Sequence, residues 1–86
     1  MSNIQLILDC TKIMRIEQAL DMGLLHIAEN LAQGKLKLVE LAEIYAIAAL
    51  PEQSHQEWCE MILHEGVLPA SDAFSDALLP VLHGKP

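Results

Sequence analysis

The chain has 86 residues, which is enough for one domain with a thin hydrophobic core. Apolar residues make up 52% of the chain and are mainly Leu, Ile and Ala, so helices are favoured and some apolar surface is expected to stay uncovered. The net charge is −7, and no Lys or Arg occurs between Leu38 and Gly84. This charge argues against nucleic acid or an anionic membrane as a partner. It favours either a basic protein partner or a simple solvated face.

The two cysteines, Cys10 and Cys59, are isolated and form no Cys-x-x-Cys motif, which is typical of a reducing cytosol. The N-terminal apolar run has no basic leader and does not resemble a signal peptide. The longest apolar stretch, residues 44–50, is far too short to span a bilayer. These features predict a cytoplasmic protein.

The first half of the chain predicts an N-terminal arm followed by two helices. Residues 1–10 form the arm, in which residues 4–8 have the composition of a short strand. Asp9 or Thr11 can cap a helix over residues 12–22, which we expect to end at Gly23. A second helix is predicted over residues 24–33, with Gly34 as its stop.

The third predicted helix, residues 38–50, is the most apolar segment of the chain and ends before Pro51. Its charged residues, Glu40 and Glu43, lie in its first half, and apolar side chains occupy every side of the second half. A helix that is apolar all round is buried in a core or in an interface. In so small a domain we expect part of it to form an interface, and therefore a homo-oligomer.

The second half of the chain predicts two further helices. Ser54 and Glu57 form a Ser-x-x-Glu capping box before a helix that runs to Glu65. A last helix is expected over residues 69–79, with Pro80 ending or kinking it and residues 83–86 as a flexible tail. The predicted fold is therefore mainly α: a single domain over residues 1–86, a small bundle of about five short helices with a possible short N-terminal strand.

Metal binding and catalysis are weakly supported. His55 and Cys59 lie one turn apart on the fourth predicted helix, but His64 lies about 140° around that helix from Cys59, so the three do not converge on a metal ion. A Cys59–His55 nucleophilic pair would lack an orienting third residue and an oxyanion-hole turn. We therefore predict no catalytic residues, no metal ligands and no cofactor, and hence a protein that is not an enzyme.

Two other chemical readings are also weak. The glycines stand singly, so no glycine-rich phosphate loop is present. The size and acidity are also those of an acyl or peptidyl carrier protein. That family needs a modifiable serine in an Asp-Ser-Leu setting, whereas Ser71-Asp72 and Ser75-Asp76 have the reverse order and no following leucine.

Three segments resemble the tail assembly chaperone family of long-tailed phages, in the version found in gene transfer agents and sometimes labelled a tail tube or minor tail component. They are residues 16–24, 27–34 and 41–50, which read IEQALDMGL, IAENLAQG and LAEIYAIAAL. The resemblance implies a non-enzymatic chaperone that coats the helical tape-measure protein in the cytosol of a bacterial host. The alternative from composition alone is a small acidic helical adaptor.

An apolar helical module can offer a groove to an amphipathic partner helix, and acidic surroundings can steer a basic partner toward it. The third predicted helix supplies the candidate partner-binding residues for either function. They are Leu41, Ile44, Tyr45, Ile47 and Leu50.

Overall fold

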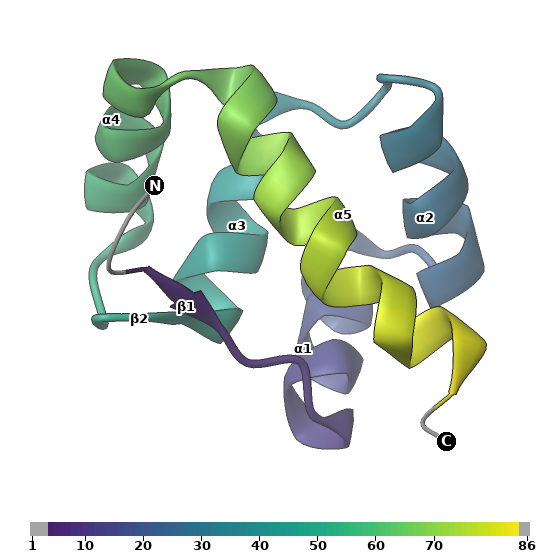
Figure 1. Ribbon diagram of the computed structural model, residues 1–86. Helices are drawn as coiled ribbons and strands as arrows, with labels where there is room; N and C mark the ends of the chain where they lie inside the picture. The colour runs from purple at the N-terminus through teal and green to yellow at the C-terminus, as the bar shows by residue number, and fades with distance from the viewer. Residues whose placement is uncertain (1–3, 85–86) are drawn as a thin grey trace.

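The computed structural model describes residues 4–84, which form five helices and two short strands. Their order along the chain is β1 (Gln5–Leu6), α1 (Cys10–Leu20), α2 (Leu24–Ala32), α3 (Leu38–Ala48), β2 (Ala49–Leu50), α4 (His55–Glu65) and α5 (Val67–His83). In Figure 1, α5 crosses the front of the molecule diagonally, with α3 behind it, α4 and α2 on either side and α1 below. The predicted small helical bundle with a short N-terminal strand is confirmed.

Helix α3 lies at the centre of the bundle and contacts α1, α4, α5 and β2. Its buried side chains point to several sides of the helix. It begins after Lys37, whose backbone N–H donates to Glu40 Oε1 at 2.8 Å. The expected end at residue 50 is wrong, because α3 stops at Ala48 and the chain turns extended at Ala49. Pro51 disfavours helical backbone at Leu50, which leaves these residues free to pair as a strand.

The two strands form a small antiparallel sheet that joins the two halves of the chain. Gln5 pairs with Leu50 and Leu6 pairs with Ala49, and Ile7 N–H donates to Ala48 O at 2.9 Å. The sheet therefore fastens the N-terminal segment to the end of α3 and places the start of α1 beside it.

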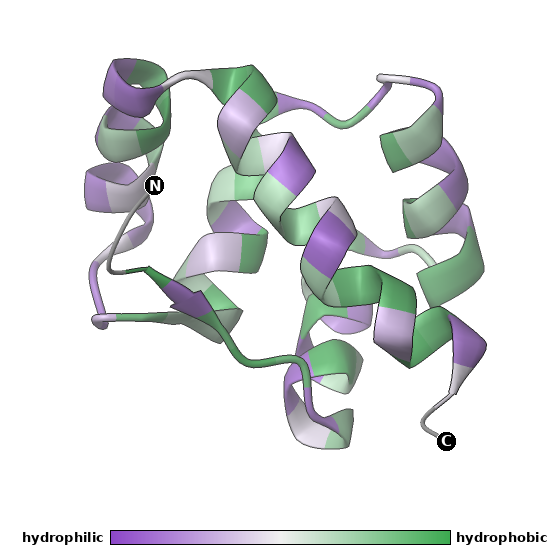
Figure 2. Ribbon diagram, in the orientation of Figure 1, coloured by the Kyte–Doolittle hydropathy of each residue, from purple (hydrophilic) through white to green (hydrophobic). Residues whose placement is uncertain are grey.

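One contiguous core connects all five helices. Tyr45 and Trp58 lie at its centre, with ring centroids 5.4 Å apart, and both side chains are fully buried. Tyr45 Oη–H donates to the backbone oxygen of Ala70 at 2.8 Å, which ties α3 to α5. Burial raises the pKa of Tyr45 to about 12. Figure 2 shows hydrophilic and hydrophobic residues alternating along α5, as expected of a helix that packs with one side only.

Two helix starts use the side chains that the sequence predicts. Asp9 Oδ1 accepts from Lys12 N–H at 2.8 Å and caps α1. The capping box of α4 is complete, with Ser54 Oγ accepting from Glu57 N–H at 3.1 Å and Glu57 Oε1 accepting from Ser54 N–H at 2.9 Å. The bond from the Ser54 backbone lowers the pKa of Glu57. Both caps are local interactions, which is why the spacing of residues reveals them.

The predicted end of the first helix is wrong. Helix α1 ends at Leu20, and Asp21, not Gly23, takes the left-handed conformation with φ 53°. Asp tolerates this conformation because its short polar side chain can bond locally. Gly23 is extended and instead precedes the first residue of α2. Gly34 does follow α2 at positive φ, as predicted.

The last helix is longer than the sequence predicts. Helix α5 runs from Val67 to His83, so Pro69 lies in its first turn and Pro80 lies inside it. Proline is well tolerated near a helix start. Pro80 lies inside the helix, where a proline removes one backbone hydrogen bond and crowds the preceding turn, and the buried side chains of Phe74 and Leu78 hold α5 against the core. The predicted tail is thus shortened, and residues 1–3 and 85–86 of the predicted termini lie outside the described part of the chain.

Candidate protein-binding surface

Three of the five predicted partner-binding residues belong to the core. Leu41 is 1% exposed and Ile44 and Tyr45 are 0% exposed, so these three side chains offer no accessible surface to a partner in this structure. The reason is that α1, α4 and α5 enclose α3 on several sides. Ile47 is half-buried and Leu50 is 39% exposed. Of the five candidates, only these two are accessible at the surface. Self-association through α3 remains a prediction, and the surface available for it is much smaller than expected.

The histidines and cysteine of α4 point in different directions. His55 Nε2 lies 3.2 Å from Val39 O and 3.6 Å from Glu43 Oε1, so its ring faces α3. Cys59 packs against the core, and His64 is exposed. Among residues 4–84, no three His, Cys, Asp or Glu side chains are placed to hold a metal ion together.

An apolar groove of about 660 Å³ runs along α1, and no residue of α3 lines it. It is built by three parts of the chain that lie far apart in sequence: the entry to α1, the start of α2 and the end of α5. In Figure 2 the stretch just after β1 and most of the last turns of α5 are coloured as hydrophobic. The apolar groove is lined by Leu8, Asp9, Cys10, Ile13, Met14, Glu17, Leu24, Pro80, Val81 and Gly84.

The α1 side of the groove is a helical stripe. Cys10, Ile13, Met14 and Glu17 occupy positions i, i+3, i+4 and i+7, which lie on one face of a helix. Met14 is 53% exposed, and its sulfur accepts a weak hydrogen bond from the Cys10 thiol at 3.8 Å. Met is a flexible side chain that adapts to different apolar partners. This stripe therefore offers a packing surface about two helical turns long.

Two carboxylates border the apolar groove. Besides capping α1 through Oδ1, Asp9 brings a negative charge to one end. Glu17 Oε2 accepts from Leu24 N–H at 2.7 Å and so fastens α1 to the first residue of α2. Among the described residues, neither carboxylate is neutralised by an ion pair with a cationic side chain. The groove is apolar along its floor and negative at its rim.

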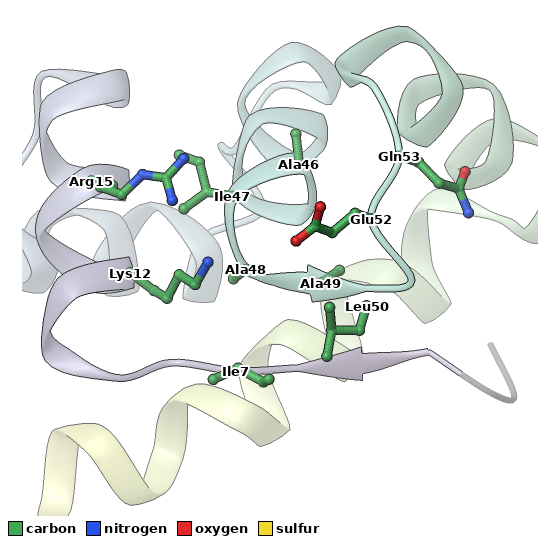
Figure 3. Close-up of a pocket in the computed structure, with 10 residues that line it drawn as sticks. All are labelled: Ile7, Lys12, Arg15, Ala46, Ile47, Ala48, Ala49, Leu50, Glu52 and Gln53. Atoms are coloured by element: carbon green, nitrogen blue, oxygen red, sulfur yellow. The ribbon is translucent and has the colours of Figure 1, made fainter.

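A second depression lies on the opposite side of α1 and carries the opposite charge. This basic cleft has a volume of about 230 Å³ and is lined by Ile7, Lys12, Arg15, the backbone and side chains of residues 46–50, Glu52 and Gln53. In Figure 3, Lys12 and Arg15 extend from α1 toward the end of α3, and Glu52 approaches from the far side. Ile47 and Leu50, the two predicted contact residues that remain at the surface, line this cleft.

The residues of the apolar groove were missed because no single segment displays them. The i, i+3, i+4, i+7 stripe of α1 is visible in the sequence, but the partners that deepen it come from α2 and α5. Three exposed apolar residues near the junction of α4 and α5 line neither the apolar groove nor the basic cleft: Leu63, Val67 and Leu68.

Comparisons with known proteins give no match to this chain among family models, curated proteins or solved structures. Within residues 4–84, no helix combines the length and the apolar character needed to cross a membrane.

Proposed function

We propose that the protein is a non-enzymatic helix-binding chaperone of the phage tail assembly type, acting in a bacterial cytosol. Its partner is an amphipathic helical segment of a tape-measure-like protein. The sequence resemblance suggests the partner, and the apolar groove along α1 is the observation that carries the proposal.

The apolar groove suits a helix rather than a small molecule. One wall is itself a helix, α1, with 11 residues and a length of about 16 Å at 1.5 Å per residue. A second helix laid beside it can fill the spaces between Ile13, Met14 and Val81 with its own side chains at i, i+3, i+4 and i+7. The part of α1 that lines the groove, from Cys10 to Glu17, supplies contact along about two turns.

The rim of the groove selects the charge of the partner. Asp9 and Glu17 face the groove in a chain with a net charge of −7. A partner helix with Lys or Arg beside its apolar stripe is attracted, and one with Glu or Asp there is repelled. The apolar floor supplies most of the affinity, while the rim sets the association rate and the specificity.

The adaptor alternative uses the same groove but differs in breadth. A chaperone that coats a long helical protein binds many sequences that share one apolar pattern, because the apolar contacts depend on the spacing of the apolar side chains and not on the exact sequence. An adaptor binds one sequence much more tightly than others of the same pattern. If three unrelated helical peptides with the same apolar pattern bind with comparable dissociation constants, the result supports the chaperone over the adaptor.

The test uses an 18-residue helical peptide with Leu at i, i+3, i+4 and i+7 and Lys on both flanks, measured by calorimetric titration into the full chain. We expect Met14→Asp to weaken binding by about tenfold or more, because it places a carboxylate in the apolar contact. Val39→Asp is the matched control, since Val39 is also 53% exposed but lies on α3, outside the groove lining. It should leave the dissociation constant within about twofold.

Circular dichroism must show that both variants keep the helical content of the parent chain. A folded Met14→Asp variant that binds the peptide as tightly as the Val39→Asp variant would place the binding surface elsewhere. Exchanging the flanking Lys for Glu in the peptide should weaken its binding to the parent chain. It should also reverse the salt dependence, because added salt then screens a repulsion and strengthens binding.

A further inference from the structure

The cations of α1 lie on the side of the helix away from the apolar groove. At 100° per residue, Lys12 and Arg15 lie about 160° and 100° from Met14 around the helix axis. They are three residues apart, so their side chains leave the helix side by side. Figure 3 shows both reaching into the basic cleft at the end of α3. The apolar groove and the basic cleft therefore lie on different sides of α1 and differ in character.

Neither cation is neutralised inside the described chain. Among residues 4–84, the single contact within 4.0 Å between a basic and an acidic side chain joins His55 to Glu43, and neither Lys12 nor Arg15 has a carboxylate oxygen within that distance. The chain carries 12 Asp and Glu against 5 Lys and Arg, so acidic partners for a surface cation are plentiful. Two adjacent cations that stay unpaired at a cleft are free to hold an anion from outside.

The lining of the basic cleft specifies what kind of anion fits. Lys12 and Arg15 contribute two positive charges and Glu52 one negative charge, which leaves a surplus of one. This matches a carboxylate better than a doubly charged phosphate, and a polyanion would meet the acidic second half of the chain. Ile7, Ile47 and Leu50 supply aliphatic surface beside the cations. The volume of about 230 Å³ exceeds the roughly 150 Å³ cavity that holds a benzene molecule, so one side chain fits.

A purely structural role for the cations leads to a different expectation. The carbonyl end of α3 lies at this cleft, and a cation near a helix C-terminus stabilises it modestly. Much of that end is already satisfied, since Tyr45 O accepts from Ala49 N–H and Ala48 O accepts from Ile7 N–H. The dipole alone does not require two cations, nor a cleft with apolar walls.

We propose that the basic cleft binds an acidic peptide segment of a partner protein. The guanidinium of Arg15 and the ammonium of Lys12 hold a Glu or Asp carboxylate, and a neighbouring aliphatic side chain of the segment packs on Ile47 and Leu50. This site is independent of the helix-binding groove. A partner that presents a basic-flanked helix and an acidic segment can contact both sides of α1.

The test is a nuclear magnetic resonance titration of the full ¹⁵N-labelled chain with the blocked peptide acetyl-Leu-Glu-Leu-amide. We expect shifts in the amides of residues 46–50 and in the Arg15 side-chain Nε–H. The matched peptide acetyl-Leu-Gln-Leu-amide, which lacks only the charge, should bind about tenfold more weakly. The double variant Lys12→Gln/Arg15→Gln should lose the difference between the peptides. The double variant Lys35→Gln/Lys37→Gln, which removes the same charge outside the cleft, should keep it.

Four results would overturn the proposal. The first is equal binding of the Glu and Gln peptides. The second is binding that survives Lys12→Gln/Arg15→Gln in a folded chain. The third is tighter binding of inorganic phosphate at the same amides, which would make this a phosphate site. The fourth is self-association of the parent chain that Lys12→Gln/Arg15→Gln abolishes, which would make a second copy the occupant.

Thermal melting separates the structural role. If the double variant melts lower and the parent chain shows no shifts with the Glu peptide, the cations only stabilise the end of α3 and the proposal is wrong. Should Lys12→Gln/Arg15→Gln fail to fold, Lys12→Met with Arg15 retained provides the same comparison, and about half of the charge effect should be lost.

Discussion

Helices α3 and α1 use their apolar side chains in opposite ways. Helix α3 is the most apolar segment of the chain, and its apolar side chains form much of the core. Leu41, Ile44 and Tyr45 are each 1% exposed or less. Helix α1 is half polar and buries only Ile16 completely, so its stripe from Cys10 to Glu17 stays at the surface. In a chain this small the most apolar helix lies at the centre, and the proposed binding surface lies on a helix that keeps an apolar stripe at the surface.

The largest effect is expected from shortening a buried side chain of α3. Ile44→Ala should lower the free energy of unfolding by about 2–5 kcal/mol, because it removes three heavy atoms from a fully buried site. Chemical denaturation measures this. Met14→Ala on α1 is the matched change and should cost less than about 1 kcal/mol, since the side chain is half exposed. Similar losses for the two variants would contradict the assignment of core and surface.

A pH titration sharpens the assignment of α3 to the core. The folded-state pKa of Tyr45 is raised to about 12 from an ordinary value of 10.0, so folding favours the neutral phenol. The associated stability is fully present below pH 10 and is lost as the pH rises from about 10 to 12. Tyr45 is the chain's one tyrosine, so Tyr45→Phe should remove this component of the alkaline destabilisation.

At neutral pH the same substitution has a smaller effect. Tyr45→Phe should cost about 1 kcal/mol, because the bond to Ala70 O is lost. Melting curves of the parent chain and the variant between pH 8 and 12 measure both effects. Parallel alkaline losses in the two proteins would show that Tyr45 does not titrate abnormally.

The smallest expected effect separates two roles of Asp9 on α1. Asp9→Ala removes the cap of α1 and should cost about 1 kcal/mol, whereas Asp9→Ser keeps a capping oxygen and should cost less than half of that. Both changes remove the rim charge and should slow association of the Lys-flanked peptide equally. Stopped-flow mixing at low and high salt measures the rate. An unchanged rate for Asp9→Ser would show that the charge at the rim does not steer the partner.

The sequence predicts those features of the fold that depend on local interactions. The caps at Asp9 and Ser54 and the stop at Gly34 are contained within a few residues, and all three are confirmed. The pairing of Ala49 with Leu6 joins residues more than 40 positions apart, so the end of α3 could not be predicted from its own residues. The passage of α5 through Pro80 likewise depends on tertiary contacts.

The binding surface was harder to predict for the same reason. Apolar character alone drew attention to α3, but burial depends on which elements surround a helix, and α1, α4 and α5 surround this one. The apolar groove needs Leu8, Leu24 and Val81 to meet beside α1, and these residues share no sequence pattern. The one signal of the groove in the sequence is the helical stripe from Cys10 to Glu17, in which Met14 is an apolar residue not needed for the core.

The central claim is that α1, not α3, provides the surface for a partner helix. The most direct measurement is a methyl nuclear magnetic resonance titration of the full chain with the Lys-flanked helical peptide. We expect the methyl signals of Leu8, Ile13, Met14, Leu24 and Val81 to shift together and saturate with one dissociation constant, while those of Ile44 do not shift. Shifts confined to Leu63, Val67 and Leu68 at the junction of α4 and α5, with the groove methyl groups unchanged, would contradict it.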